Sequence, residues 1–106
     1  MQAGKLNRRI TFQAETITYN SINEPISAWV DLATIWAQAL TTGSREFYAA
    51  QKLYAETAIV FRIHFSNRYS SKMRIKYGDR YFHLLGEPQD PDGLRKELLI
   101  SAKEVA

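Results

Sequence analysis

The sequence contains no cysteine, so neither a disulfide bond nor a reactive or metal-binding thiolate is available to it. It also contains no apolar run that approaches the ~20 residues needed to span a membrane as a helix. The basic N-terminus, residues 1–9, is not followed by the apolar stretch of a secretion signal. These absences predict a soluble intracellular protein with no membrane partner.

Recognisable catalytic and cofactor-binding motifs are absent as well. The glycines are scattered without the spacing of a phosphate-binding loop, and no Gly-x-Ser-x-Gly motif occurs. His64 and His83 each alternate with aromatic or aliphatic neighbours, which favours sheet residues over metal ligands. Asp90 and Asp92 flank Pro91 in a turn cluster, a pattern more typical of turn formation than of a calcium site. We predict no catalytic residue, no metal, no cofactor and no enzymatic activity.

What the sequence does contain is repeated period-two alternation of apolar and polar residues, the signal of β-strands. A length of 106 residues suits one domain, residues 1–106. Sequential antiparallel strands tend to curl up, because closure removes exposed edges. The predicted fold class is therefore mainly β, an antiparallel barrel or sandwich of about six strands. The expected strands cover residues 9–18, 29–40, 57–65, 73–77, 80–85 and 97–102.

One short helix is predicted at about 44–54, between the second and third strands. From Phe47 to Tyr54 apolar residues recur at helical spacing, with Leu53 alongside. Ser44 is the expected N-cap, because its hydroxyl can accept a hydrogen bond from the first turn.

Positive charge gathers in one part of the chain, although the net charge is only +3. Between Arg62 and Arg80, the basic residues stand against one acid, Asp79. From Thr11 to Gly43, by contrast, there are acids and no basic residue. Such polarity can steer a partner or a second copy of the chain; solvated β faces that simply differ in charge are the alternative. The candidate contact residues are Arg62, Arg68, Lys72, Arg74, Lys76 and Arg80.

The same region supports a second hypothesis. Aromatic rings and cations interleaved on a β framework are typical of proteins that stack the bases of single strands and follow their phosphates. A small single-stranded nucleic-acid-binding module built on residues 62–81 is therefore the alternative function. Several of these rings also fall in phase with the expected core face, which favours burial. The aromatic residues are Phe65, Tyr69, Tyr77 and Tyr81.

An ordered series of short segments carries a family resemblance. Residues Gly4 to Gln13 follow the pattern Gly-x-Leu-x-x-Arg-Ile-x-Phe-Gln. The later segments are Trp29-Val30-Asp31, Ile35-Trp36-Ala37-Gln38, Gly43-Ser44-Arg45-Glu46, Thr57 with Phe61-Arg62-Ile63, Met73-Arg74-Ile75, and Gly78-Asp79-Arg80-Tyr81-Phe82. Together they resemble the phage head–tail joining family, the head–tail adaptor, head-closure or stopper proteins of long-tailed double-stranded DNA phages and prophages.

The resemblance implies a structural virion protein with a β-barrel and a helix. Members of the family dock on the portal–adaptor connector, form a twelve-fold ring that closes the DNA exit channel, and present the surface for tail attachment. The implied partners are the connector proteins, further copies of the chain, tail proteins, and phage DNA contacted without sequence specificity. The implied location is the head–tail connector of the virion, after assembly in the cytoplasm of the bacterial host.

The first loop departs from the family pattern, which usually has Asp or Asn followed by Gly. The resemblance suggests that this loop, from Tyr19 to Ala28, gates the channel, and we expect it to be polar and mobile. An ordinary hairpin connection is the alternative. The candidate channel loop consists of Asn20, Ser21, Ile22, Asn23, Glu24 and Pro25.

Overall fold

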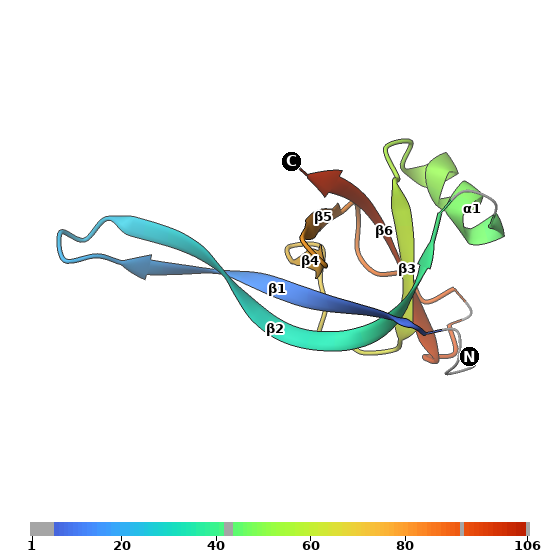
Figure 1. Ribbon diagram of the computed structural model, residues 1–106, viewed down its shortest axis with the longest axis horizontal. Coiled ribbons are helices and arrows are strands. Elements are labelled where there is room, and N and C mark those ends of the chain that lie inside the picture. Colours follow the sequence, from blue (N-terminus) through green and yellow to red (C-terminus); the bar gives the residue numbers. More distant parts are fainter. Residues whose placement is uncertain (1–5, 42–43, 92, 106) are drawn as a thin grey trace.

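Six antiparallel strands close into one barrel in the computed structural model (Figure 1), which describes residues 6–41, 44–91 and 93–105. The strands follow the order β1-β2-β3-β6-β5-β4, and β4 pairs with β1 to close the barrel. The predicted mainly β fold of about six strands with one helix is confirmed. The elements are β1 (Arg8–Tyr19), β2 (Pro25–Leu40), α1 (Arg45–Leu53), β3 (Ile59–His64), β4 (Arg74–Tyr77), β5 (Arg80–Leu84) and β6 (Glu97–Val105).

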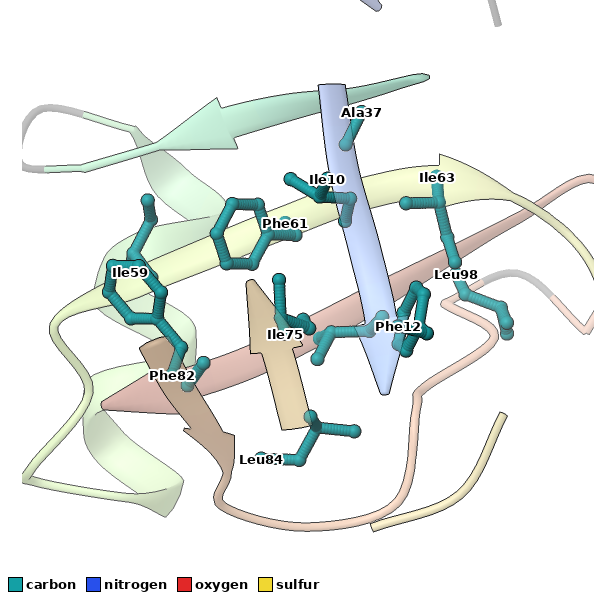
Figure 2. Packing of buried hydrophobic residues seen from close by; sticks show 12 residues of the cluster. Ile10, Phe12, Ala37, Ile59, Phe61, Ile63, Ile75, Phe82, Leu84 and Leu98 are labelled. Atoms are coloured by element: carbon teal, nitrogen blue, oxygen red, sulfur yellow. The ribbon is translucent and has the colours of Figure 1, made fainter. Parts of the chain in front are cut away.

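The barrel interior is filled by inward-facing side chains at alternate strand positions (Figure 2). The Phe61 ring packs edge-on against Phe82, with ring centroids 5.6 Å apart, and against Tyr77 at 5.8 Å. Ile10 and Phe12 on β1 and Ile59, Phe61 and Ile63 on β3 face the interior, as the alternation of apolar residues predicts. Ala14, which continues the same alternation on β1, lies beyond the bulge and outside the core. The buried cluster comprises Ile10, Phe12, Ala37, Ile59, Phe61, Ile63, Ile75, Phe82, Leu84, Leu98, Ile100 and Ala102.

Helix α1 covers the outer face of the barrel at β3. The Ser44 hydroxyl accepts a hydrogen bond from the Phe47 N–H at 3.0 Å, as predicted for the N-cap. Phe47 and Ala50 are buried against Val60. Leu53 is exposed, because it lies six residues beyond Phe47 and hence about 240° round the helix axis. In the described part of the chain, no helix is long and apolar enough to cross a membrane.

Strands β1 and β2 form a two-stranded ribbon that extends far beyond the barrel (Figure 1). Their pairing continues to Tyr19 opposite Pro25 and shifts once, at a bulge between Phe12 and Gln13. The extents of the molecule, 51 × 27 × 26 Å, reflect this projection. We call residues 13–31 the arm.

The arm corrects two predictions. β2 begins at Pro25, not at residue 29, and the expected loop from Tyr19 to Ala28 is wrong because Pro25 to Ala28 pair with Thr16 to Tyr19. Proline and serine in this segment indicated a turn, yet a proline is tolerated as the first residue of a strand, where no ladder hydrogen bond is lost. Only residues 20–24 connect the strands.

Outside the barrel, the two strands of the arm have only each other as partners. β2 pairs with β3 from Gln38 to Leu40, and β1 pairs with β4 from Thr11 to Gln13. An isolated two-stranded ribbon is marginally stable in water. The arm is therefore the element that would gain most stability from a partner.

Candidate interaction surfaces

Arg62, the first of the predicted contact residues, serves the chain's own fold. Its guanidinium donates hydrogen bonds to Gln38 Oε1 at 3.0 Å and to Glu46 Oε1 at 2.5 Å, and its Nε lies 3.6 Å from Glu97 Oε1. The side chain is only 16% exposed. These contacts tie α1 to β2, β3 and β6 and leave little of Arg62 for a partner.

The Glu46 carboxylate is held in its charged form. Its pKa is lowered chiefly by a hydrogen bond from its own backbone N–H, and the hydrogen bond and charge of Arg62 act in the same direction against desolvation. The ion pair between helix and barrel is therefore intact at neutral pH.

Arg74 sits at the root of the arm, where β1, β2, β4 and β5 meet. Its guanidinium carbon lies 4.5 Å from the ring centroid of Trp29 and 4.2 Å from that of Tyr81. Its Nε donates to Gln13 Oε1 at 2.7 Å, and Gln13 Nε2 donates to Asp31 Oδ1 at 2.8 Å. This network fixes the arm to the barrel. Gln13 and Asp31 escaped prediction, because polar side chains on a strand usually indicate solvent.

Arg80 pairs with Glu104 on the neighbouring strand β6. Two guanidinium nitrogens, Nε and Nη2, bind the two carboxylate oxygens at 2.9 and 2.8 Å. This hydrogen bonding raises the pKa of Arg80 and lowers the pKa of Glu104. Both side chains are about half exposed, so the pair remains screened by water.

The structure thus separates the predicted contact residues into two groups. Arg62, Arg74 and Arg80 make internal contacts. The side chains of Arg68, Lys72 and Lys76 have no hydrogen bond or ion pair to another described residue, so these cations remain available. Arg68 and Lys72 lie in the connection between β3 and β4, whereas Lys76 lies on β4.

The aromatic residues proposed to stack bases are largely used inside the protein. Tyr69 stacks on Phe12 with ring centroids 3.9 Å apart, and Tyr77 packs against Phe61 in the core. Tyr81 covers the Arg74 guanidinium. Three of the four rings therefore have packing partners within the protein, which weakens the case for base stacking in this region.

The two histidines do not meet. His64 is on β3 and His83 on β5, and β6 lies between these strands. His83 packs near Trp29, with ring centroids 6.3 Å apart. Within the described residues, no group of three or more His, Asp or Glu side chains is placed to hold a metal ion. Asp92 lies outside the described residues.

The tip of the arm, residues 20–25, is an organised turn. The Asn20 side-chain oxygen accepts hydrogen bonds from the backbone N–H of Ile22 at 3.0 Å and of Glu24 at 2.9 Å. Asn23 adopts a positive φ of 63°, which asparagine tolerates better than most residues. Ile22 is 70% exposed. The candidate channel loop is therefore a compact tip that presents an isoleucine.

Large exposed apolar side chains are concentrated on the arm and its base. They alternate along the two strands, so both faces of the ribbon present some of them. Between Thr16 and Val30 the only charged residue is Glu24, at the tip. Exposed, uncharged ribbon is an association hazard for a monomer and typical of a surface that a partner covers. The exposed residues are Ile17, Tyr19, Ile22, Ile26, Val30, Leu32 and Trp36.

A cleft of about 890 Å³ lies beside the start of β1, between residues 34–36 of β2 and residues 64–69. Ile35, Trp36, Phe65 and Tyr69 supply apolar walls, and Arg68 and His64 are the basic side chains in the lining.

Two comparisons with known protein sequences both identify phage head completion proteins as relatives. The model of the family described as "Phage head completion protein" matches residues 1–105. The head completion protein gp16 of Bacillus phage SPP1 is 32% identical over 97 residues, which cover 90% of this chain and 87% of gp16.

Solved structures share the fold. Protein SF1141 from Shigella flexneri 2a has a TM-score of 0.77 and 29% identity, over 100% of this chain and 98% of that one. A chain from the virion of a native gene transfer agent particle has a TM-score of 0.61 at 15% identity, over 94% and 96% of the two chains. This second likeness concerns the fold alone.

Proposed function

The chain belongs to the phage head completion protein family, and from this premise we propose that it docks on the portal–adaptor connector of a DNA-filled head, forms a ring that closes the exit channel, and presents the surface for the tail. Family membership makes it a structural component of the virion and not an enzyme. Its proposed partners are connector proteins, further copies of itself, tail proteins, and DNA contacted without sequence specificity.

The projecting arm is the observation that carries this proposal. The barrel buries its own core, whereas the arm leaves Ile17, Ile26 and Val30 in water. Beyond Gln13, which pairs with β4, the two strands of the arm have no further strand to pair with in the described chain. Ring subunits make heterologous contacts between unlike patches, which a barrel with one projecting arm provides. We assign the available cations Arg68 and Lys72 to such contacts.

Lys76 remains a candidate for the connector or the tail, because its side chain shares the outer face of β4 with Arg74. Arg62, Arg74 and Arg80 act through the internal contacts described above. Reversal of Lys76 would weaken docking without disturbing the barrel.

The tip is the segment that we assign to the channel. Copies of Ile22 gathered at the axis of a ring would form an apolar plug, held in shape by the turn that Asn20 organises. With Glu24 as its one charge, the tip offers no cation to bind the phosphates of DNA. Such a plug would block the channel without adhering to the genome.

The proposal is tested with DNA-filled heads that lack this protein. Purified chain is added, and three quantities are measured: co-sedimentation with heads, protection of packaged DNA from nuclease, and tail attachment. All three should rise together. A chain that fails to sediment with heads, while DNA retention stays low, would refute the docking role.

The channel assignment has its own test, Ile22→Ser, with Ser21→Ala as the matched control at the same tip. Ile22→Ser should bind heads normally and yet leave the DNA accessible to nuclease, because the plug has lost its apolar side chain. If Ile22→Ser protects DNA as well as Ser21→Ala does, the tip does not close the channel.

A further inference from the structure

One face of the arm combines aliphatic side chains with a single negative charge. Ile26 and Val30 alternate along β2 on the same face, and they are 47% and 44% exposed. Their cross-strand partners, Thr18 and Ala14, are uncharged. Glu24 continues this alternation at the tip end and has no ion-pair partner among the described residues. We call this surface, with Glu24, Ile26 and Val30, the aliphatic arm face.

The cleft beside the start of β1 has the complementary character. Ile35, Phe65 and Tyr69 give it apolar walls, and the Arg68 side chain brings an available positive charge. The exposed Trp36 ring at its edge lies under a second cation, with the Arg9 guanidinium 4.8 Å from the ring centroid. An aliphatic strand that carries a carboxylate could pack against these apolar walls and pair its charge with Arg68.

The arm of a molecule cannot fill its own cleft. The two strands stay paired, with one bulge between Phe12 and Gln13, from Ile10 opposite Ile35, at the cleft, to Tyr19 opposite Pro25, at the tip. At about 3.4 Å per residue, the nine residues from Ile10 to Tyr19 put the tip roughly 30 Å away. Figure 1 shows the tip directed away from the barrel. Any arm in the cleft must belong to another molecule.

We propose that the aliphatic arm face of one copy seats in the cleft of the next, with Ile26 and Val30 against its apolar walls and Glu24 beside Arg68. Both halves of the match lie on the same chain, which points to a second copy as the occupant. The contact joins two different patches, so it repeats from copy to copy and can close into a ring. It deepens the ring proposed above and rests on that proposed function.

The absence of cysteine makes a direct test available. The double variant Glu24→Cys with Arg68→Cys places one thiol on each side of the contact, and within one copy the length of the ribbon separates the tip from the cleft. The pair Ile17→Cys with Arg68→Cys is the matched control, because Ile17 lies on the opposite face of the arm. Both variants are assembled onto DNA-filled heads and oxidised, and disulfide-linked multimers are resolved on a denaturing gel.

The Glu24–Arg68 pair should give a ladder of multimers, roughly tenfold stronger than the control pair. Normal incorporation into heads with no ladder, or with equal ladders from both pairs, would overturn the arm-in-cleft contact and leave the proposed docking role standing. Failure of both double variants and of the unmodified chain to join heads would refute the proposed function and this contact with it.

A charge exchange supplies a test that does not depend on oxidation. Glu24→Arg and Arg68→Glu should each lower the affinity for heads about tenfold, since like charges then face each other. The two changes combined should restore affinity, whereas Lys52→Glu, on the exposed helix surface outside the contact, should have no effect. Additive losses in the combined variant would contradict the pairing of Glu24 with Arg68.

Discussion

The ion pairs of this protein differ in solvent exposure, and this difference determines how much each contributes to the free energy of unfolding. Arg62 is 16% exposed and serves three elements, whereas Arg80 and Glu104 form a well-oriented pair in the open. Coulomb attraction is strong only where solvent is excluded, and removal of one partner from a shielded pair leaves the other desolvated.

Arg62→Gln should therefore lower the free energy of unfolding by about 2 kcal/mol, because Glu46 and Glu97 lose their cation. Arg80→Gln is the matched control on the surface and should leave the urea midpoint nearly unchanged. Equal midpoints for the two variants would show that Arg62 does not tie the helix to the barrel.

The lowered pKa of Glu46 predicts a pH dependence with a definite sign. A carboxyl whose pKa is lower in the folded state stabilises that state above its unfolded pKa, and the benefit disappears as the pH falls through the folded value. Glu46→Gln should thus be less stable than the unmodified chain at pH 7, and the two should converge as the pH falls through the lowered pKa of Glu46. Urea unfolding of both proteins from pH 7 downwards measures the difference in their free energies of unfolding. A difference that does not change with pH would contradict the stabilising role of the Glu46 carboxylate.

At the scale of elements, the arm depends on the network at its root. The Arg74 guanidinium between Trp29 and Tyr81 joins the ribbon to β4 and β5, and the planar group also reaches Gln13. A lysine keeps the charge but cannot present the same planar, stacking surface. The orientation of the arm should therefore be sensitive to this one side chain.

Arg74→Ala should lower the unfolding free energy by about 1–2 kcal/mol and shift the emission of Trp29 to longer wavelength, because the indole ring loses its cover. Trp36→Phe serves as the background, so that Trp29 alone reports. Arg74→Lys should give an intermediate shift. Emission unchanged in Arg74→Ala would mean that the root does not hold Trp29.

Local signals predicted some elements well and the arm poorly. The β4–β5 hairpin and α1 have compact signatures, a Gly-Asp turn between alternating runs and a Ser44 cap before helical spacing. The start of β2 at Pro25 has no such signature, because no core faces the arm and its sequence needs no alternation of apolar and polar residues. The first part of β2 is a strand because it pairs with β1 across the turn that the Asn20 side chain organises.

The predicted contact residues show the same division. Arg62, Arg74 and Arg80 lie close together in the sequence and were therefore predicted as one basic region. In the fold they lie on different strands or faces, and each makes hydrogen bonds with different residues. The outer part of the arm was not predicted as a surface, although the sequence has no charged residue between Thr16 and Asn23. Exposure cannot be read from residue type alone, because an isoleucine on a strand normally indicates a core.

In the molecule taken as a whole, the barrel and the arm have different roles. The barrel folds on its own core and carries the cleft, and the arm carries apolar surface to a place where only another molecule can cover it. A virion protein that joins others in sequence needs this combination, stable before assembly and incomplete until assembled. We therefore expect the arm to be required for assembly and dispensable for folding.

Deletion of the arm separates its role in assembly from any role in folding. Residues 16–28 are removed and Glu15 is joined to its register partner Trp29 through an Asn-Gly turn, which keeps the root intact. The shortened chain should unfold as cooperatively as the full chain, with the same near-ultraviolet signature of its core, and yet fail to protect DNA in heads that lack this protein. A folded, armless chain that retains DNA and accepts tails as well as the full chain would contradict the account.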